Sequence, residues 1–302
     1  MRDFNEYRGI FPAFYACYDE KGDADTSRTR ELARYFKQVG VKGLYVGGSS
    51  GECIYQNVEE RKRILEAVME EVGGELTVIA HVACNSTRDS RELAAHAESL
   101  KVNAIAAIPP IYFHLPNAGI AKYWNDISDA APNTDFIIYN IPQLAGTALS
   151  VPLLKEMLKN PRCIGVKNSS PATQDIQMWR DEGAIVFNGP DEQLVAGLAT
   201  GAIGGIGGTY GVMPELYLKI YDCVNKGEFE KARDINNDCC RIIYRLCSAY
   251  GSMYAVIKEV MRLRGAPDIG GVREPFLNLA ETDYPLCKEI AADIDAAIGR
   301  YC

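Results

Sequence analysis

Cys163-Ile164-Gly165-Val166-Lys167 is a short apolar run that ends in a single cation. Short apolar runs of this kind recur along the chain. A run of this kind predicts a buried strand. Because a low dielectric disfavours the ammonium form, a lysine held there tends to lose its proton, and the neutral amine is a nucleophile that condenses with ketones. A strand-end lysine whose head reaches water is the alternative interpretation.

The preceding apolar run favours the reactive interpretation of this lysine. It reads Phe136-Ile-Ile-Tyr-Asn-Ile-Pro142 and predicts an adjacent strand. That strand carries Tyr139 at the level of Lys167. A buried amine beside a tyrosine is a better candidate for chemistry than a lone strand-end lysine.

Further outward, similar apolar runs recur along the chain, each followed by an amphipathic stretch with helical spacing such as Thr26–Val39, Val58–Val72 or Thr87–Leu100. Asp25, Ser86 and Ser150 stand where N-caps are expected. Eight β-then-α units predict one (β/α)8 barrel. A doubly wound sheet is the alternative, but no G-x-G-x-x-G follows the first run. The strands are expected at Ile10–Cys17, Gly43–Gly48, Leu76–Val82, Ala104–Pro109, Phe136–Ile141, Cys163–Lys167, Ala184–Asn188 and Ala202–Gly207.

After the eighth run the pattern is wholly helical. Helices are expected at Met213–Asn225, Glu228–Tyr250, Tyr254–Arg264 and Tyr284–Tyr301, and the first of them belongs to the barrel. We therefore expect residues 1–226 to form the barrel that carries the active site. Residues 227–302 are expected to form a helical extension packed on it.

The composition excludes several classes of protein. The chain has 302 residues, 47% of them hydrophobic, and a formal net charge of -8 with no basic run, which argues against nucleic acid and anionic membranes as partners. No segment has the unbroken apolar length of a membrane span, and the start, Met1-Arg-Asp-Phe-Asn-Glu, has no apolar signal-peptide core. These features predict a cytoplasmic protein.

The cysteine and histidine content argues against disulfides and metals. The ten cysteines include no C-x-x-C pair, so we expect them to be reduced apolar packers. The three histidines, His81, His96 and His114, are scattered through an expected strand, helix and loop. Metal-assisted chemistry is therefore disfavoured, and we expect neither a metal nor another cofactor.

Polar and glycine residues follow the expected strands at one rim, where a (β/α)8 barrel has its active site. Gly47–Gly51 has two interpretations, which the sequence supports equally: an ordinary turn, or an anion site built from serine hydroxyls and helix N-terminal N–H groups. The default interpretation of Asp191-Glu192 is that the two acids complement the dipole of the helix that follows. They could instead accept hydrogen bonds from a polyhydroxylated substrate. The glycines of Gly204–Gly208 either allow close packing or leave room for a long ligand.

The combination of these motifs resembles the dihydrodipicolinate synthase/N-acetylneuraminate lyase family over essentially the whole chain. The motifs that carry the resemblance are Gly48-Ser-Ser-Gly-Glu52, Tyr139-Asn-Ile-Pro142, Gly165-Val-Lys167 and Gly204-Gly-Ile-Gly-Gly208. The resemblance implies that Lys167 forms a Schiff base with a 2-keto acid and that Tyr139 shuttles protons. It also implies a homotetramer, in which Tyr112 reaches into a neighbouring subunit's site. Ser49, which binds the substrate carboxylate with Ser50, is expected to join the proton relay.

The branch of the family follows from residues further along the chain. The synthases typically carry an arginine two residues after the proline of Y-N-x-P, whereas this chain has Leu144. Asn188-Gly-Pro-Asp-Glu192 resembles the lyase motif N-G-x-D-E, whose acids hold the glycerol tail of sialic acid. The resemblance thus implies cleavage of sialic acid to pyruvate, with synthase, other sugar-acid aldolase or non-catalytic binding activities as alternatives. Substrate contacts are expected from Ser49, Ser50, Ser169, Gly189, Asp191, Glu192, Gly207 and Gly208, the last standing where some lyases have serine.

Overall fold

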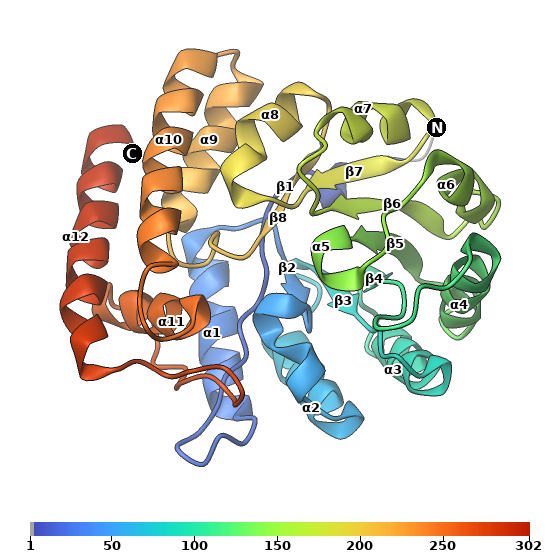
Figure 1. The fold of residues 1–302 in the computed structure, drawn as a ribbon, viewed down its shortest axis with the longest axis horizontal. Coiled ribbons are helices and arrows are strands. Elements are labelled where there is room, and N and C mark those ends of the chain that lie inside the picture. Colours follow the sequence, from blue (N-terminus) through green and yellow to red (C-terminus); the bar gives the residue numbers. More distant parts are fainter. Residues whose placement is uncertain (1–2) are drawn as a thin grey trace.

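The computed structural model describes residues 3–302, so the first two residues of the N-terminal stretch considered above lie outside it. Within residues 3–302, eight parallel strands run in the order β1-β8-β7-β6-β5-β4-β3-β2 and curl into a barrel ringed by helices (Figure 1). The expected (β/α)8 fold is confirmed. The strands are β1 Gly9–Pro12, β2 Gly43–Val46, β3 Thr77–His81, β4 Ala104–Ala107, β5 Asp135–Asn140, β6 Cys163–Asn168, β7 Ile185–Asn188 and β8 Gly204–Gly207.

The barrel closes between β1 and β2 through residues just beyond β1. Pro12, the last residue of β1, has no N–H to donate. Ala13 forms an isolated parallel bridge with Tyr45, and the N–H of Phe14 donates to the Tyr45 carbonyl at 2.9 Å. The expectation that this strand continues to Cys17 was therefore wrong, although its backbone still completes the barrel.

Helices cover the outside of the barrel, and the three N-caps predicted from the sequence are confirmed. The Asp25 carboxylate accepts from the N–H groups of Ser27 and Arg28, and Ser86 and Ser150 cap their helices in the same way. The helices are α1 Thr26–Val39, α2 Val58–Val72, α3 Thr87–Ser99, α4 Asn117–Asp129, α5 Pro142–Ala145, α6 Val151–Met157, α7 Gln174–Asp181, α8 Leu194–Ala199, α9 Pro214–Asn225, α10 Phe229–Leu246, α11 Met253–Leu263 and α12 Tyr284–Tyr301.

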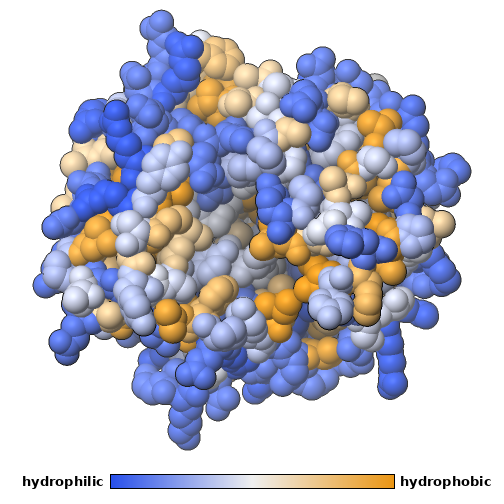
Figure 2. Space-filling model, viewed as in Figure 1, coloured by the Kyte–Doolittle hydropathy of each residue, from blue (hydrophilic) through white to orange (hydrophobic). Residues whose placement is uncertain are grey.

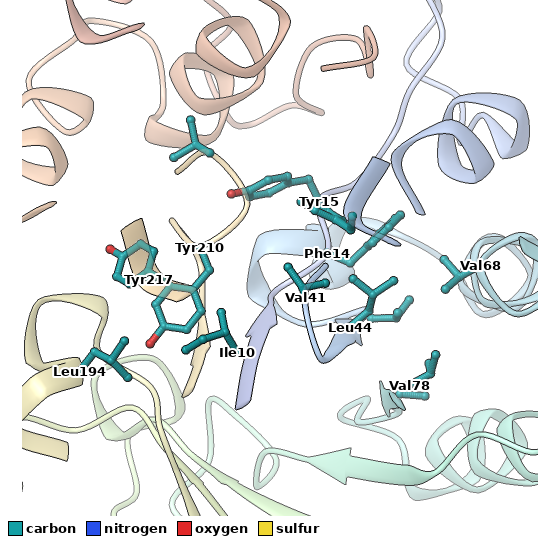
Figure 3. Packing of buried hydrophobic residues seen from close by; sticks show 14 of the residues in the cluster. Ile10, Phe14, Tyr15, Val41, Leu44, Val68, Val78, Leu194, Tyr210 and Tyr217 are labelled. Carbon is teal, nitrogen blue, oxygen red and sulfur yellow. The ribbon is translucent and has the colours of Figure 1, made fainter. Parts of the chain in front are cut away.

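The hydrophobic core has two layers. The larger layer lies between the strands and the surrounding helices, and Figure 3 shows part of it around Ile10, Leu44 and Tyr210. The smaller layer fills the inside of the barrel and includes Phe11, Tyr45 and Phe187. The strands are therefore buried on both faces, which accounts for their nearly continuous apolar runs.

The C-terminal helices α10, α11 and α12 pack against one another and against α9, on one side of the barrel (Figure 1). Helix α10 ends at Leu246, four residues before the expected end at Tyr250. Beyond this end, the Asp283 carboxylate holds the connection to α11 by accepting hydrogen bonds from the N–H groups of Tyr250 and Gly251. None of the helices in residues 3–302 is both long and apolar enough to cross a membrane.

Candidate active site

Lys167 lies near the C-terminal end of β6, in the centre of the barrel. It pairs in register with Tyr139 on β5 and with Phe187 on β7. Lys167 is only 4% exposed, so the alternative interpretation, a lysine whose head reaches water, is wrong. The expected juxtaposition of Lys167 and Tyr139 is confirmed as a structural arrangement.

The surroundings of Lys167 favour a neutral amine. Its Nζ lies 4.1 Å from the centroid of the Tyr45 ring and 3.9 Å from that of the Tyr139 ring. Burial lowers the pKa of Lys167 to about 7, although the negative charge of Asp191 opposes this shift. Lys167 is therefore much easier to deprotonate than an exposed lysine, and its neutral form is the nucleophile.

Tyr139 is also buried, and it keeps its proton. Burial raises the pKa of its phenol to about 12, while hydrogen bonding with the hydroxyls of Ser49 and Ser169 opposes that rise. These two serines come from the ends of different strands, β2 and β6. The phenol is thus connected to hydroxyl groups on two sides, an arrangement suited to passing protons rather than to holding a negative charge.

The turn after β2 contains a short 3₁₀ helix, Ser49–Gly51, which brings Ser49 and Ser50 to the rim. Glu52 follows in the left-handed region at φ 53°. Its carboxylate is buried and accepts from Lys258 Nζ at 2.9 Å and from the Arg273 N–H at 2.9 Å. The turn is therefore anchored by the C-terminal part of the chain.

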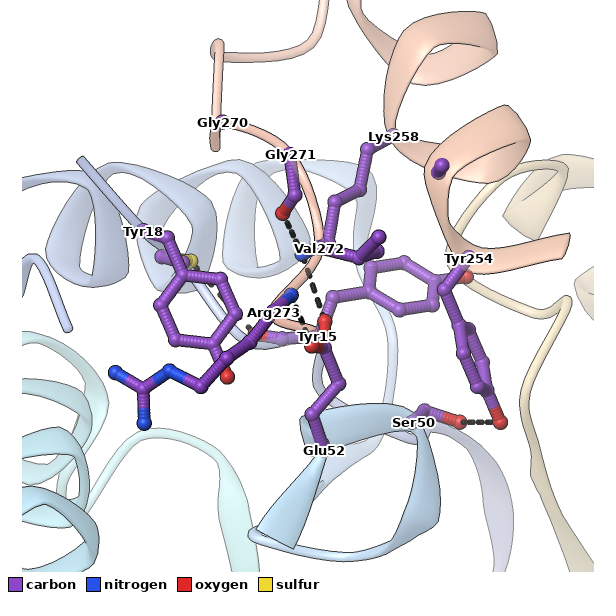
Figure 4. A network of polar contacts seen from close by, with 12 residues as sticks. Tyr15, Tyr18, Ser50, Glu52, Tyr254, Lys258, Gly270, Gly271, Val272 and Arg273 are labelled. Carbon is purple, nitrogen blue, oxygen red and sulfur yellow. Dashed lines mark hydrogen bonds and ion pairs between the residues drawn. The ribbon is translucent and has the colours of Figure 1, made fainter. Parts of the chain in front are cut away.

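Figure 4 shows this anchoring network. Lys258 Nζ also donates to the carbonyl of Gly271 at 2.5 Å, which fixes the loop that carries Arg273. On the cavity side, Ser50 Oγ donates to Tyr254 Oη over 3.5 Å. Helix α11 supplies both Tyr254 and Lys258, so it holds the Ser49–Glu52 turn from two directions.

Asp191 begins a 3₁₀ helix, Asp191–Gln193, after β7. Its Oδ2 accepts hydrogen bonds from the N–H and the hydroxyl of Thr209, each at 2.6 Å. Burial raises the pKa of Asp191 to about 6, against the effect of these hydrogen bonds. Near neutral pH the group is therefore mostly a carboxylate. Glu192 beside it is exposed at the rim.

Two glycines leave space that these polar groups occupy. A Cβ on Gly207 would lie 2.1 Å from Asp191 Oδ1, and a Cβ on Gly189 would lie 2.1 Å from Ser169 Oγ. Side chains at these positions would displace Asp191 and Ser169. Gly207 and Gly189 therefore act on the site by allowing close approach.

These residues surround a cavity of about 260 Å³ at the C-terminal rim of the barrel. Figure 2 shows this face of the molecule hollowed near its centre. Gly207 lies behind Asp191 instead of on the cavity wall. Nine of the expected site residues do line the cavity. They are Ser49, Ser50, Tyr139, Lys167, Ser169, Gly189, Asp191, Glu192 and Gly208.

Tyr112 lies apart from this cavity within the single chain. It is 87% exposed, adopts a left-handed φ of 81°, and borders a separate hollow of about 620 Å³ with Phe113 and Leu115. The structure therefore does not bring Tyr112 to the site of its own subunit. Its expected role depends on a second copy of the chain.

Several residues that line the cavity, or that contact a residue lining it, were not among the expected site residues. Tyr45 and His81 lie inside the barrel beside Tyr139, with His81 Nδ1 2.9 Å from the Gly47 carbonyl. Burial and the neighbouring Arg61 lower the pKa of His81 to about 3, so it is neutral. In addition, the C-terminal part of α10, the residue that follows it and the start of α11 supply part of the cavity wall. These residues are Ile243, Cys247, Met253 and Tyr254.

Among residues 3–302, no group of three or more histidine, cysteine, aspartate or glutamate side chains could hold a metal ion. The chemistry available to this constellation is that of an amine nucleophile, a phenol with two hydroxyl neighbours, and a carboxylate. Together they can form an iminium, move a proton and bind hydroxyl groups.

Comparison with known proteins gives consistent matches over the full length. The model of the dihydrodipicolinate synthetase family matches residues 6–294. An N-acetylneuraminate lyase of Mediterraneibacter gnavus is 58% identical, covering 100% of this chain and 96% of the relative, and one of Escherichia coli is 31% identical, covering 95% and 97%. The wild-type sialic acid aldolase of Ruminococcus gnavus superposes with a TM-score of 0.97 at 57% identity, over 99% of this chain and 100% of that one. A catalytic lysine mutant of the same aldolase superposes with a TM-score of 0.99 at 57% identity, over 100% of both chains.

Proposed function

The chain belongs to the dihydrodipicolinate synthetase family, and on this premise we propose that it is a carbon–carbon lyase that cleaves N-acetylneuraminate to pyruvate and N-acetylmannosamine. The observation that carries the proposal is the buried Lys167 amine, with its pKa near 7, beside Tyr139. The similar aldolase whose catalytic residue is a lysine supports the same chemistry.

The reaction begins when Lys167 Nζ attacks C2 of the open-chain keto acid. A C–N bond forms, the ketone oxygen leaves as water, and the resulting iminium carries a positive charge. Ser49 and Ser50 bind the substrate carboxylate at the turn after β2. The iminium then accepts the electron pair of the C3–C4 bond as that bond breaks, and Lys167 is left holding a neutral enamine.

Tyr139 moves the proton that cleavage releases. The C4 hydroxyl becomes an aldehyde, so its proton must leave as the bond breaks. A phenol whose pKa is about 12 is a proton carrier: it passes its own proton to Ser49 while it accepts the new one, and Ser49 at the same time releases its hydroxyl proton onward to solvent. N-Acetylmannosamine leaves, a proton returns to C3 of the enamine, and water hydrolyses the pyruvate iminium to restore the amine.

The substrate tail is placed at Asp191 and Glu192. Asp191 lines the cavity, and its carboxylate can accept from a substrate hydroxyl in addition to the two hydrogen bonds that Oδ2 accepts from Thr209. Leu144 also lines the cavity, with an uncharged side chain. We therefore expect the cavity to bind a substrate with a hydroxylated tail and to disfavour one that carries a second carboxylate.

A substrate panel tests the proposal directly. N-Acetylneuraminate cleavage should be much faster than condensation of pyruvate with aspartate semialdehyde, since no cation replaces Leu144 to bind the aldehyde's carboxylate. Equal rates for the two reactions would overturn the lyase activity in favour of the synthase. An inert protein that still binds pyruvate would mark a non-catalytic barrel.

Replacing Asp191 by alanine should lower kcat/KM for N-acetylneuraminate far more than it lowers the affinity for pyruvate. A lost charge-assisted hydrogen bond costs roughly 1.5–3 kcal/mol, about tenfold to somewhat over a hundredfold in kcat/KM. Steady-state kinetics with N-acetylneuraminate and binding of pyruvate measure the two effects. Thr209→Val is the matched control, because it removes one contact of Asp191 but keeps the carboxylate. Equal losses for both ligands would make Asp191 a structural residue.

We also propose that the active unit is a homotetramer in which Tyr112 completes the site of a neighbouring subunit. The exposed aromatic side chains of Tyr112 and Phe113 beside the hollow of α4 support this assembly, since exposed apolar patches mark interfaces. Light scattering at the working concentration should give the mass of four chains. A monomer with full activity would contradict the assembly.

We place the enzyme in the cytoplasm. In the described part of the chain the ten cysteines are free, and several are buried in the core. Unpaired thiols in this number are typical of a reducing compartment.

A further inference from the structure

The Nζ atom of Lys167 lies in a corner formed by two aromatic rings. Tyr45 on β2 provides one ring face at 4.1 Å and Tyr139 on β5 the other at 3.9 Å. The two ring centroids are 5.7 Å apart and the rings are nearly perpendicular, at 79°. The faces therefore meet Nζ from directions at about a right angle, and they leave its other sides for a substrate.

Tyr45 plays no part in the reaction described so far. It is fully buried in the inner layer of the core, and its hydroxyl has no hydrogen-bond partner among the described residues. The protein thus holds this side chain through its ring, including the contacts with Tyr139 and His81. If this position only had to fill space, a branched aliphatic side chain would do so equally well, and such side chains are the usual ones inside these barrels.

We propose that Tyr45 is a further catalytic residue, whose ring face stabilises the positive charge that Lys167 acquires as an iminium. This inference rests on the proposed Schiff-base chemistry. The face of an aromatic ring attracts a cation within about 6 Å, and the attraction is strongest when both are shielded from water. Tyr45 meets both conditions at Lys167 Nζ.

The charge balance of the reaction shows when this contact matters. The neutral amine and the neutral ketone, with one added proton, give one water and a cationic iminium. That charge disappears when the C3–C4 electrons form the enamine, and it returns when the enamine is protonated. The ring face of Tyr45 therefore favours the iminium states over the neutral amine, which raises the occupancy of the reactive species.

Two substitutions separate the ring from the hydroxyl. Tyr45→Leu should raise the pyruvate concentration needed for half-maximal borohydride trapping, and lower kcat/KM for N-acetylneuraminate, by about tenfold to thirtyfold, the value of a buried cation–π contact. Tyr45→Phe keeps the ring face and should stay within about twofold of wild type. Phe136→Leu, which removes a fully buried ring in the outer layer of the core, is the matched control for lost packing and should trap pyruvate normally.

A fluorinated series decides the question even if Tyr45→Leu folds poorly. Phenylalanine, its 4-fluoro form and its 3,4,5-trifluoro form at position 45 have nearly the same shape but a progressively weaker negative ring face. Trapping should weaken stepwise along this series, with unchanged thermal unfolding. Equal trapping along the series, wild-type behaviour of Tyr45→Leu, or equal damage by Tyr45→Phe would overturn the role of the ring. If wild-type protein formed no adduct at Lys167, the proposed Schiff base itself would fail, and the role of Tyr45 with it.

Discussion

Replacing Lys167 by alanine is expected to abolish cleavage of N-acetylneuraminate while the fold remains intact. The substitution removes the nucleophile that forms the iminium, and therefore the covalent route itself. Turnover should fall to background. In parallel, borohydride reduction with pyruvate should add mass at Lys167 in the wild-type protein and nowhere in the variant, as read by peptide mass spectrometry.

The control for this result is Lys167→Met. Methionine keeps most of the length and apolar volume of the side chain, so any loss shared by both variants comes from the missing amine and not from a cavity. Thermal unfolding of both proteins checks the fold. A reduced adduct on a peptide that lacks residue 167 would show that another lysine carries the chemistry.

Replacing Tyr139 by phenylalanine is expected to preserve Schiff-base formation but to remove most turnover. Phenylalanine retains the ring face that lies 3.9 Å from Lys167 Nζ, so only the hydroxyl and its hydrogen bonds with Ser49 and Ser169 are lost. Loss of a positioned proton-transfer group typically costs on the order of 10²–10⁴-fold. Borohydride trapping and steady-state kinetics together separate the two steps.

Tyr123→Phe is the matched control for the Tyr139 variant. It removes another buried phenol hydroxyl, which donates to the Cys84 carbonyl at 2.7 Å and lies outside the cavity. This control should lose some stability and keep its turnover. Near-normal turnover in Tyr139→Phe would instead show that this phenol is structural.

The architecture could be predicted because each strand is buried on both faces and each helix on one. The apolar runs and the N-caps then reveal the units one by one. Strand and helix ends were less accurate, since they depend on distant partners. After Pro12 the first strand keeps only the contacts that Gly207 and Tyr45 offer to Ala13 and Phe14, and beyond the end of α10 Asp283 binds the backbone of Tyr250 and Gly251.

The same distinction applies to the site. Lys167, Tyr139 and Asp191 could be predicted as site residues because the C-terminal ends of parallel strands converge on one rim and because their motifs resemble those of the family. Tyr254 and Met253 could not, because their helix shows only the ordinary amphipathic pattern of a packing element. Its placement over the cavity is a product of tertiary packing, which no local pattern encodes. Tyr45 was missed for a related reason, since an aromatic residue in an apolar strand indicates core.

The buried ion pair between Glu52 and Lys258 has a consequence for how the protein is made. Glu52 leaves the ribosome early, but its cation is encoded 206 residues later, and the backbone N–H of Arg273 that completes its shell comes 221 residues later. A buried carboxylate without its partner costs several kcal/mol. A nascent chain can therefore form its strands in order, yet it cannot fix the turn that we propose binds the substrate carboxylate until its last quarter has emerged. The candidate active site is thus among the last parts of the molecule to mature, although its residues are distributed from the first quarter of the chain onward.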